Sequence, residues 1–219
     1  MMSDFLCTRA AIYDLLARVY TYPIDYAVLE AISALRVERA PAAVSDALAV
    51  MQARIVATDN REELVESLNV EATRLFEGPG QPAAPAYASF YLNKGHLMGE
   101  AALAVRRAYL AANALPREDG RIPPDHLALE LGFMAYLAHE AASTPDSDAA
   151  RALVASAQFL RQHLLTWVPR FDAAVVGATA HPFFVGLANL TSALLEADAA
   201  WLEEVLETQR HPTVSEVTR

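Results

Sequence analysis

Apolar residues recur at intervals of three and four along almost the whole chain of 219 residues. Leu127, Leu131 and Met134, for example, share one side of a helix, because an α-helix turns once in 3.6 residues. No run of β-branched residues alternates with polar ones, which is the pattern typical of strands. Alanine, the best helix former, is abundant. The sequence therefore predicts an all-α fold, a single globular bundle of about nine helices.

Prolines and glycines divide this helical pattern. Two glycines and three prolines fall within eight residues of the segment 77–88, which predicts an irregular turn. After that turn, a long helix is expected over residues 89–113. A further helix is expected to begin after Thr144, and Pro169 is expected to close it, because proline removes a backbone donor.

One domain is expected to span residues 1–207, since a chain of this length can bury a substantial core. Within it, the polar connection at residues 114–123 is expected to join two helical lobes. Such a connection also allows two chains to exchange helices, so the sequence is compatible with both a monomer and a domain-swapped dimer. The polar residues 208–219 are expected to form a flexible tail.

The charge and the cysteine content exclude several classes of function. With 27 acidic and 17 basic residues, the formal net charge is −10, which disfavours nucleic acid and favours a basic partner. Cys7 is the only cysteine, so no intrachain disulfide is expected. The chain starts without a basic and apolar leader, and no uncharged apolar stretch reaches 18 residues. A cytoplasmic protein without stable membrane insertion is expected.

Residues 121–141 form the most informative segment. Pro123 and Pro124 oppose helix, and an apolar helix follows directly. Asp125 and His126 are therefore expected at or just inside the helix start, where a carboxylate is favoured. Glu130 stands one turn after His126, on the same side. This group of polar residues is either a functional site or a well-capped helix start.

A metal-dependent hydrolase is the alternative that these residues leave open. His126 with Glu130, and His96 with Glu100, have the i, i+4 spacing of two metal ligands. Each pair supplies only two ligands, whereas catalytic zinc normally takes three from the protein. The simpler interpretation is a helix cap and a surface pair. The sequence contains no nucleophile elbow and no phosphate-binding loop, and it predicts neither a metal nor another cofactor.

Three segments, taken in order, resemble the TorD/DmsD/NarJ family of redox-enzyme maturation chaperones. The first segment combines Glu-Ala-Thr-Arg-Leu-Phe-Glu-Gly-Pro-Gly at 71–80 with Pro-Ala-Tyr-Ala-Ser-Phe-Tyr at 85–91. The second is Pro-Asp-His-Leu-Ala-Leu-Glu-Leu-Gly-Phe-Met at 124–134, and the third is His-Pro-Phe-Phe-Val-Gly-Leu-Ala-Asn-Leu-Thr at 181–191. Leu16 to Pro23 also fits. Ala86 departs from the family pattern, in which an aromatic residue often follows the proline directly.

The resemblance implies a non-enzymatic, cytoplasmic chaperone. Such a protein binds the twin-arginine signal peptide, or the apo form, of a molybdopterin-containing oxidoreductase subunit of the dimethyl sulfoxide reductase type. It holds that subunit until the cofactor is inserted. The residues to which the resemblance assigns peptide binding are Leu75, Phe76, Pro85, Tyr87, Pro123, Asp125, His126 and Glu130.

The physical chemistry of a signal peptide agrees with this expectation. Its basic end and apolar stretch suit an apolar groove with Asp125 or Glu130 at the rim, where arginine forms charge-assisted hydrogen bonds. Replacing both Asp125 and His126 with alanine is expected to leave the fold intact and to weaken peptide binding.

Overall fold

The computed structural model describes residues 2–21, 23–37, 40–78, 80–117 and 120–210. Within these ranges the chain forms helices and no strands. Two of the helical segments are continuous runs of several elements: α4 continues into η1, and α8 continues through η2 into α9. The described residues thus contain nine continuous helical segments, which confirms the predicted all-α bundle. The elements are α1 (Met2–Thr21), α2 (Tyr26–Ala34), α3 (Ala42–Val56), α4 (Arg61–Ala72), η1 (Thr73–Glu77), α5 (Ala88–Leu92), α6 (Glu100–Ala111), α7 (Leu127–Ser143), α8 (Asp146–Phe159), η2 (Leu160–Leu164), α9 (Leu165–Ala178) and α10 (Pro182–Arg210).

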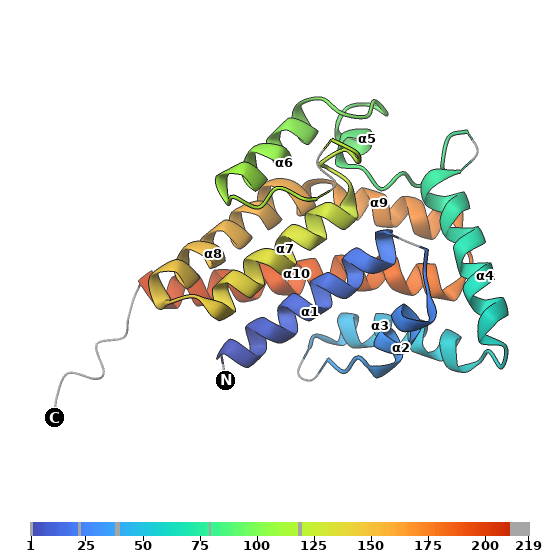
Figure 1. Ribbon diagram of the computed structural model, residues 1–219. Coiled ribbons are helices and arrows are strands. Elements are labelled where there is room, and N and C mark those ends of the chain that lie inside the picture. Colours follow the sequence, from blue (N-terminus) through green and yellow to red (C-terminus); the bar gives the residue numbers. More distant parts are fainter. Residues whose placement is uncertain (1, 22, 38–39, 79, 118–119, 211–219) are drawn as a thin grey trace.

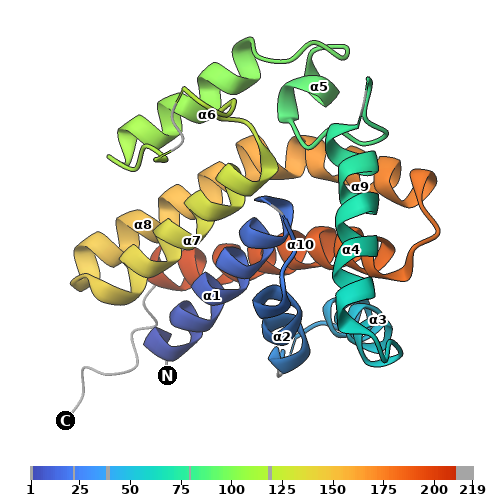
Figure 2. The same ribbon diagram turned by 45° about the vertical axis from the view of Figure 1, so that its right-hand side comes forward.

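The long helix α10 runs through the length of the bundle (Figure 1). Its 29 residues span about 43 Å, and α3 and α9 pack along it, while α1 packs along α7 (Figure 1). At Gly186 the contact with α3 is close, because an added Cβ would lie 2.8 Å from Met51 Cγ and 3.1 Å from the Ala47 carbonyl oxygen. Figure 2 shows α4 running across the ends of the other helices, and α5 and α6 at the top.

α10 is also long and apolar enough to cross a membrane, although the sequence analysis expects no spanning helix. Half of its apolar window is buried inside the fold, and the core helix of a folded domain passes the same test. The helix continues to Arg210, three residues into the expected tail, and residues 211–219 lie outside the described part.

The predicted long helix over residues 89–113 is wrong. α5 ends at Leu92, and α6 begins only at Glu100. In the loop between them Lys94, Gly95, Met98 and Gly99 have positive φ angles, which no helix accommodates. The Asn93 side chain fixes the loop by donating to the carbonyl oxygen of Met98 at 2.7 Å.

The predicted helix end at Pro169 is also wrong, because α9 continues through this proline. A proline inside a helix removes one hydrogen bond. The adjoining side chains of Trp167, Val168 and Phe171 are fully buried, and their packing offsets that loss. The π-helical turn η2 just before α9 rotates these side chains relative to α8.

Candidate peptide-binding site

Two of the three family-like segments meet at a short backbone pairing. The amide of Leu127 donates to the carbonyl oxygen of Ala86 at 2.9 Å, and the amide of Ala88 donates to that of Asp125 at 3.0 Å. Tyr87 and His126 face each other across this antiparallel bridge. The start of α5 and the start of α7 are thereby joined, although they lie almost 40 positions apart in the sequence.

Asp125 caps a different helix from the one expected. Its side chain is fully buried, and Oδ2 accepts the amide hydrogen of Ser89, the second residue of α5, at 2.7 Å. Tyr87, the residue before α5, supplies no side-chain cap of its own. The cap of α7 is His126, whose Nδ1 accepts from the amide of Ala128 at 3.1 Å. Asp125 therefore links α5 to α7, and α7 begins at Leu127.

Glu130 lies in the interior beneath this junction. Its side chain is fully buried, and the Trp167 ring nitrogen lies 3.5 Å from Oε2. Burial, and then the charge of Asp125, raise the pKa of Glu130 well above its usual value. Since neither Asp125 nor Glu130 reaches the surface, the open acidic rim expected from these two residues is absent from this conformation.

Leu75, Phe76 and Pro85 are also buried. The Phe76 ring contacts those of Tyr20, Phe171 and Phe184, with centroids 5.7–6.0 Å apart. These members of the predicted site support the surface from below and cannot touch a peptide in this conformation.

Tyr87, Pro123 and His126 are the members of the predicted set that remain partly exposed. The rings of Tyr87 and His126 meet edge to face with centroids 4.8 Å apart. Burial lowers the pKa of His126 to about 4, so the ring is neutral at neutral pH. Burial raises the pKa of Tyr87, and the charge of Glu77 raises it further. The exposed carboxylate of Glu77 is thus within electrostatic reach of Tyr87.

Glu77 is a candidate site residue that the sequence analysis missed. It directly follows Phe76 in the first family-like segment, where it was treated as part of an irregular turn. It is exposed at the end of η1. Its position directly after the Leu-Phe pair of that segment was the available signal, but its approach to Tyr87 depends on how the chain returns from η1 to the start of α5.

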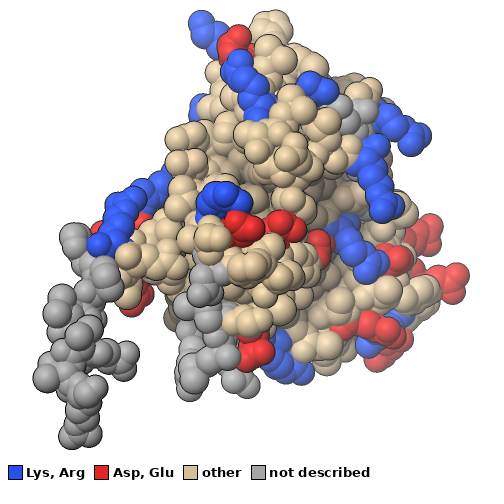
Figure 3. All heavy atoms as spheres, turned by 60° about the vertical axis from the view of Figure 1, so that its left-hand side comes forward, with Lys and Arg blue, Asp and Glu red and all other residues tan. Residues whose placement is uncertain are grey.

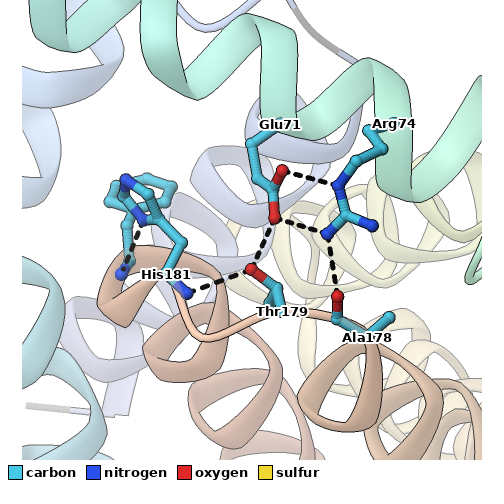
Figure 4. Close-up of polar contacts among 6 residues, drawn as sticks. Glu71, Arg74, Ala178, Thr179 and His181 are labelled. Atoms are coloured by element: carbon cyan, nitrogen blue, oxygen red, sulfur yellow. Dashed lines mark hydrogen bonds and ion pairs between the residues drawn. The ribbon is translucent and has the colours of Figure 1, made fainter.

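The first and third family-like segments meet at the corner between α4 and the α9–α10 connection (Figure 4). Glu71 accepts hydrogen bonds from Arg74 at 2.6 and 2.8 Å and from the Thr179 hydroxyl at 2.5 Å. Arg74 also donates to the Ala178 carbonyl oxygen at 2.8 Å, and the amide of His181 donates to the Thr179 hydroxyl at 3.0 Å. The hydrogen bond from Arg74 is the main cause of the lowered pKa of Glu71.

An open groove of about 640 Å³ adjoins this corner. Glu63, Glu66 and Val70 line it from α4, and His181 lines it from the start of α10. Glu63 and Glu66 are at least partly exposed, and they lie on the same helical run that ends at Glu77. Exposed carboxylates therefore line α4 as well as the end of η1.

A buried carboxyl group, Asp172 on α9, makes stability depend on pH. Burial raises its pKa to about 8, against the opposing effect of the Ser192 hydroxyl that donates to it. An unfolded aspartate has a pKa of about 3.9, so its contribution to stability is present below about pH 4 and is lost as pH rises towards 8. We expect Asp172→Asn to raise the melting temperature at about pH 7.5 and to change it little at about pH 4. Equal shifts at both pH values in calorimetry would contradict this assignment.

The hydrolase alternative receives no support from the geometry. In the part of the chain that the structure describes, no three or more His, Cys, Asp or Glu side chains are grouped so that they could hold a metal ion. His126 uses Nδ1 for the α7 cap, and Glu130 is enclosed beside Trp167.

The comparisons with known proteins support the family resemblance. A family model described as nitrate reductase delta subunit matches residues 37–173. The chaperone protein TorD of Vibrio cholerae serotype O1 is 32% identical over 149 residues, which is 68% of each chain. TorD of Aliivibrio salmonicida is 24% identical over 204 residues, covering 89% of this chain and 94% of the relative.

Among solved structures, a redox enzyme maturation protein from Archaeoglobus fulgidus matches with a TM-score of 0.48 and 20% identity, over 89% of this chain and 93% of that one. The family model covers well over half of this chain, and the relatives named above are chaperones rather than enzymes. The chain therefore belongs to the TorD/NarJ family, the chaperones that serve the maturation of redox enzymes.

Proposed function

We propose that this chaperone binds the twin-arginine signal segment of a molybdopterin-containing oxidoreductase subunit of the dimethyl sulfoxide reductase type. It acts in the cytoplasm, on the apo subunit, and holds it until the cofactor is inserted. The family supports the class of client, and the chemistry of the surface around Tyr87 supports the class of ligand.

One observation carries the proposal: the exposed carboxylate of Glu77 lies within electrostatic reach of Tyr87, whose ring meets that of His126 edge to face. A guanidinium group stacks on aromatic faces and pairs with carboxylates through two parallel hydrogen bonds. Because burial keeps His126 neutral, the imidazole does not repel an arginine. The group is thus suited to one arginine of the signal segment.

The charge of the whole molecule supports the encounter. A net charge of −10 attracts a basic peptide, and Glu63 and Glu66 extend the acidic surface along α4. Attraction of this kind is screened by salt, so the association rate is expected to fall as ionic strength rises.

Glu77→Gln is expected to weaken the binding of a synthetic twin-arginine signal peptide by about five- to tenfold, because one charge-assisted pair is worth about 1 kcal/mol at an exposed site. Isothermal titration measures this change. Glu30→Gln, a neutralised carboxylate on the exposed face of α2, is the matched control and should leave affinity unchanged. A peptide with two lysines in place of the arginines should also bind more weakly, since lysine lacks the planar fork.

Equal affinities of the Glu77 and Glu30 variants would remove Glu77 from the site. Failure of the wild-type chain to bind the peptide would refute the proposed function itself. Affinity capture from the native host, with mass spectrometry of the captured subunit, then identifies the client.

A further inference from the structure

Exposed apolar side chains gather around α6. Thirteen large apolar side chains are exposed in the part of the chain that the structure describes, and six of them fall within residues 92–115. A contiguous exposed apolar patch marks an interaction site on a soluble protein. The six residues, which together with Arg107 are called the α6 face below, are Leu92, Leu97, Met98, Leu103, Leu110 and Leu115.

The way α6 is attached explains why this face stays open. Ala102, Val105 and Tyr109 turn towards the core, and the Tyr109 hydroxyl donates to the carbonyl oxygen of Pro124 at 2.9 Å. Leu103 and Leu110, seven residues apart, therefore point to the opposite side, and each is almost half exposed.

The loop before α6 enlarges the exposed surface. Met98 has a left-handed backbone conformation, and its backbone amide donates a hydrogen bond to the Ser89 hydroxyl oxygen at 3.0 Å. Both Met98 and Leu97 are about half exposed. Together with α6 they form a surface of apolar side chains that the fold itself leaves uncovered.

The local charge is opposite to that of the rest of the molecule. Residues 92–121 contain five basic and three acidic residues, against twelve basic and twenty-four acidic elsewhere. Lys94, Arg107 and Arg117 are exposed there. Figure 3, which brings the side with α6 forward, shows blue side chains predominating at the top and red ones lower down. The α6 face therefore suits an acidic ligand, unlike the surface near Glu77.

We propose that the α6 face binds an acidic amphipathic helix of a protein partner. Leucines at i and i+7 match the apolar stripe of a second helix packed alongside. Carboxylates flanking that stripe would pair with Arg107 and with Lys94 at the two sides of the contact. Glu100 lies 3.6 Å from Arg107 on the same side of α6, and an acidic partner would compete with this exposed and therefore weak ion pair for Arg107.

This inference goes beyond the proposed function and does not depend on it. The signal segment is basic and belongs at Glu77, whereas the α6 face takes an acidic segment. A client that used both would be held at two points, and its affinity would exceed that of either contact alone.

The test uses a fluorescent, acidic amphipathic helical peptide with leucines on one face, and a second, neutral peptide in which glutamine replaces every glutamate. The wild-type chain should bind the acidic peptide at least about tenfold more tightly than the neutral one. Leu103→Gln combined with Leu110→Gln should weaken the acidic peptide by about tenfold, because two apolar contacts are lost. Val154→Gln, which changes another exposed apolar side chain, on α8, should not.

Circular dichroism and melting temperature establish that the double variant and the Val154 variant are folded, and the affinity of both for the twin-arginine peptide should stay at the wild-type value. Three results would overturn the inference. The wild-type chain could show no preference for the acidic peptide, or the double variant could bind that peptide as tightly as the Val154→Gln variant does. Thirdly, the double variant could keep its affinity for the acidic peptide and lose binding to phosphatidylserine vesicles, or lose self-association. A failure of the twin-arginine peptide to bind would refute the proposed function. The affinities of the wild-type chain and the double variant for the acidic peptide would still test the α6 face.

Discussion

Replacing Asp198 with alanine is expected to lower the free energy of unfolding by about 3–5 kcal/mol, because the change leaves a buried arginine without its counter-charge. Arg9 on α1 donates to both Asp198 oxygens, at 2.6 and 2.8 Å, and the Tyr13 hydroxyl donates to Oδ2 at 2.7 Å. All three side chains are buried. Burial by itself lowers the pKa of Arg9. The hydrogen bonds to Asp198 and the negative charge of Asp198 outweigh this effect, so the pKa of Arg9 is raised.

Urea unfolding of matched variants separates this effect from that of a surface ion pair. Asp148→Ala, which breaks the exposed pair with Arg151, should cost less than about 1 kcal/mol. Replacing Arg9 with methionine and Asp198 with leucine together should recover much of the lost stability, since no charge then remains buried. A single Asp198 variant as stable as the Asp148 variant would show that α1 and α10 are not held by this pair.

Helix periodicity accounts for most of the fold that the sequence predicts. The break between α5 and α6 was not predictable in the same way, because Leu92, Leu97 and Leu103 continue a plausible apolar pattern across it. What ends the helix is a loop conformation held by Asn93 and Ser89 through side-chain bonds to Met98. At Pro169 the opposite occurred: a local rule against helix was overridden by the burial of neighbouring aromatic residues.

The candidate site shows a similar division. The family-like segments correctly indicated residues that come together, such as Tyr87 and His126. Their exposure was not predictable, because a carboxylate in a sequence is expected at the surface. Asp125 and Glu130 are buried because α5 folds back onto the start of α7 and because Trp167 covers the interior. The Arg9–Asp198 pair, 189 residues apart, left no sequence signal at all.

The burial of Asp125 changes what its replacement should do. Asp125→Ala removes the cap of α5 and leaves the buried amide of Ser89 without an acceptor, which should lower the free energy of unfolding by about 2 kcal/mol. The expectation from sequence alone, an intact fold with weaker peptide binding, is therefore revised. Loosening of α5 displaces Tyr87, so peptide affinity should fall as a consequence of the structural change.

Asp125→Asn distinguishes that indirect effect from a direct contact with the client, because the amide oxygen can still accept the Ser89 hydrogen bond while the charge is lost. If Asp125 acts through α5, the asparagine variant should retain protection of the Ser89 amide in hydrogen exchange, and it should retain most of the peptide affinity. The alanine variant should lose both. If instead both variants bind the peptide equally weakly while the Ser89 amide stays protected, the Asp125 charge contacts the arginine directly, and the junction must open when the client binds.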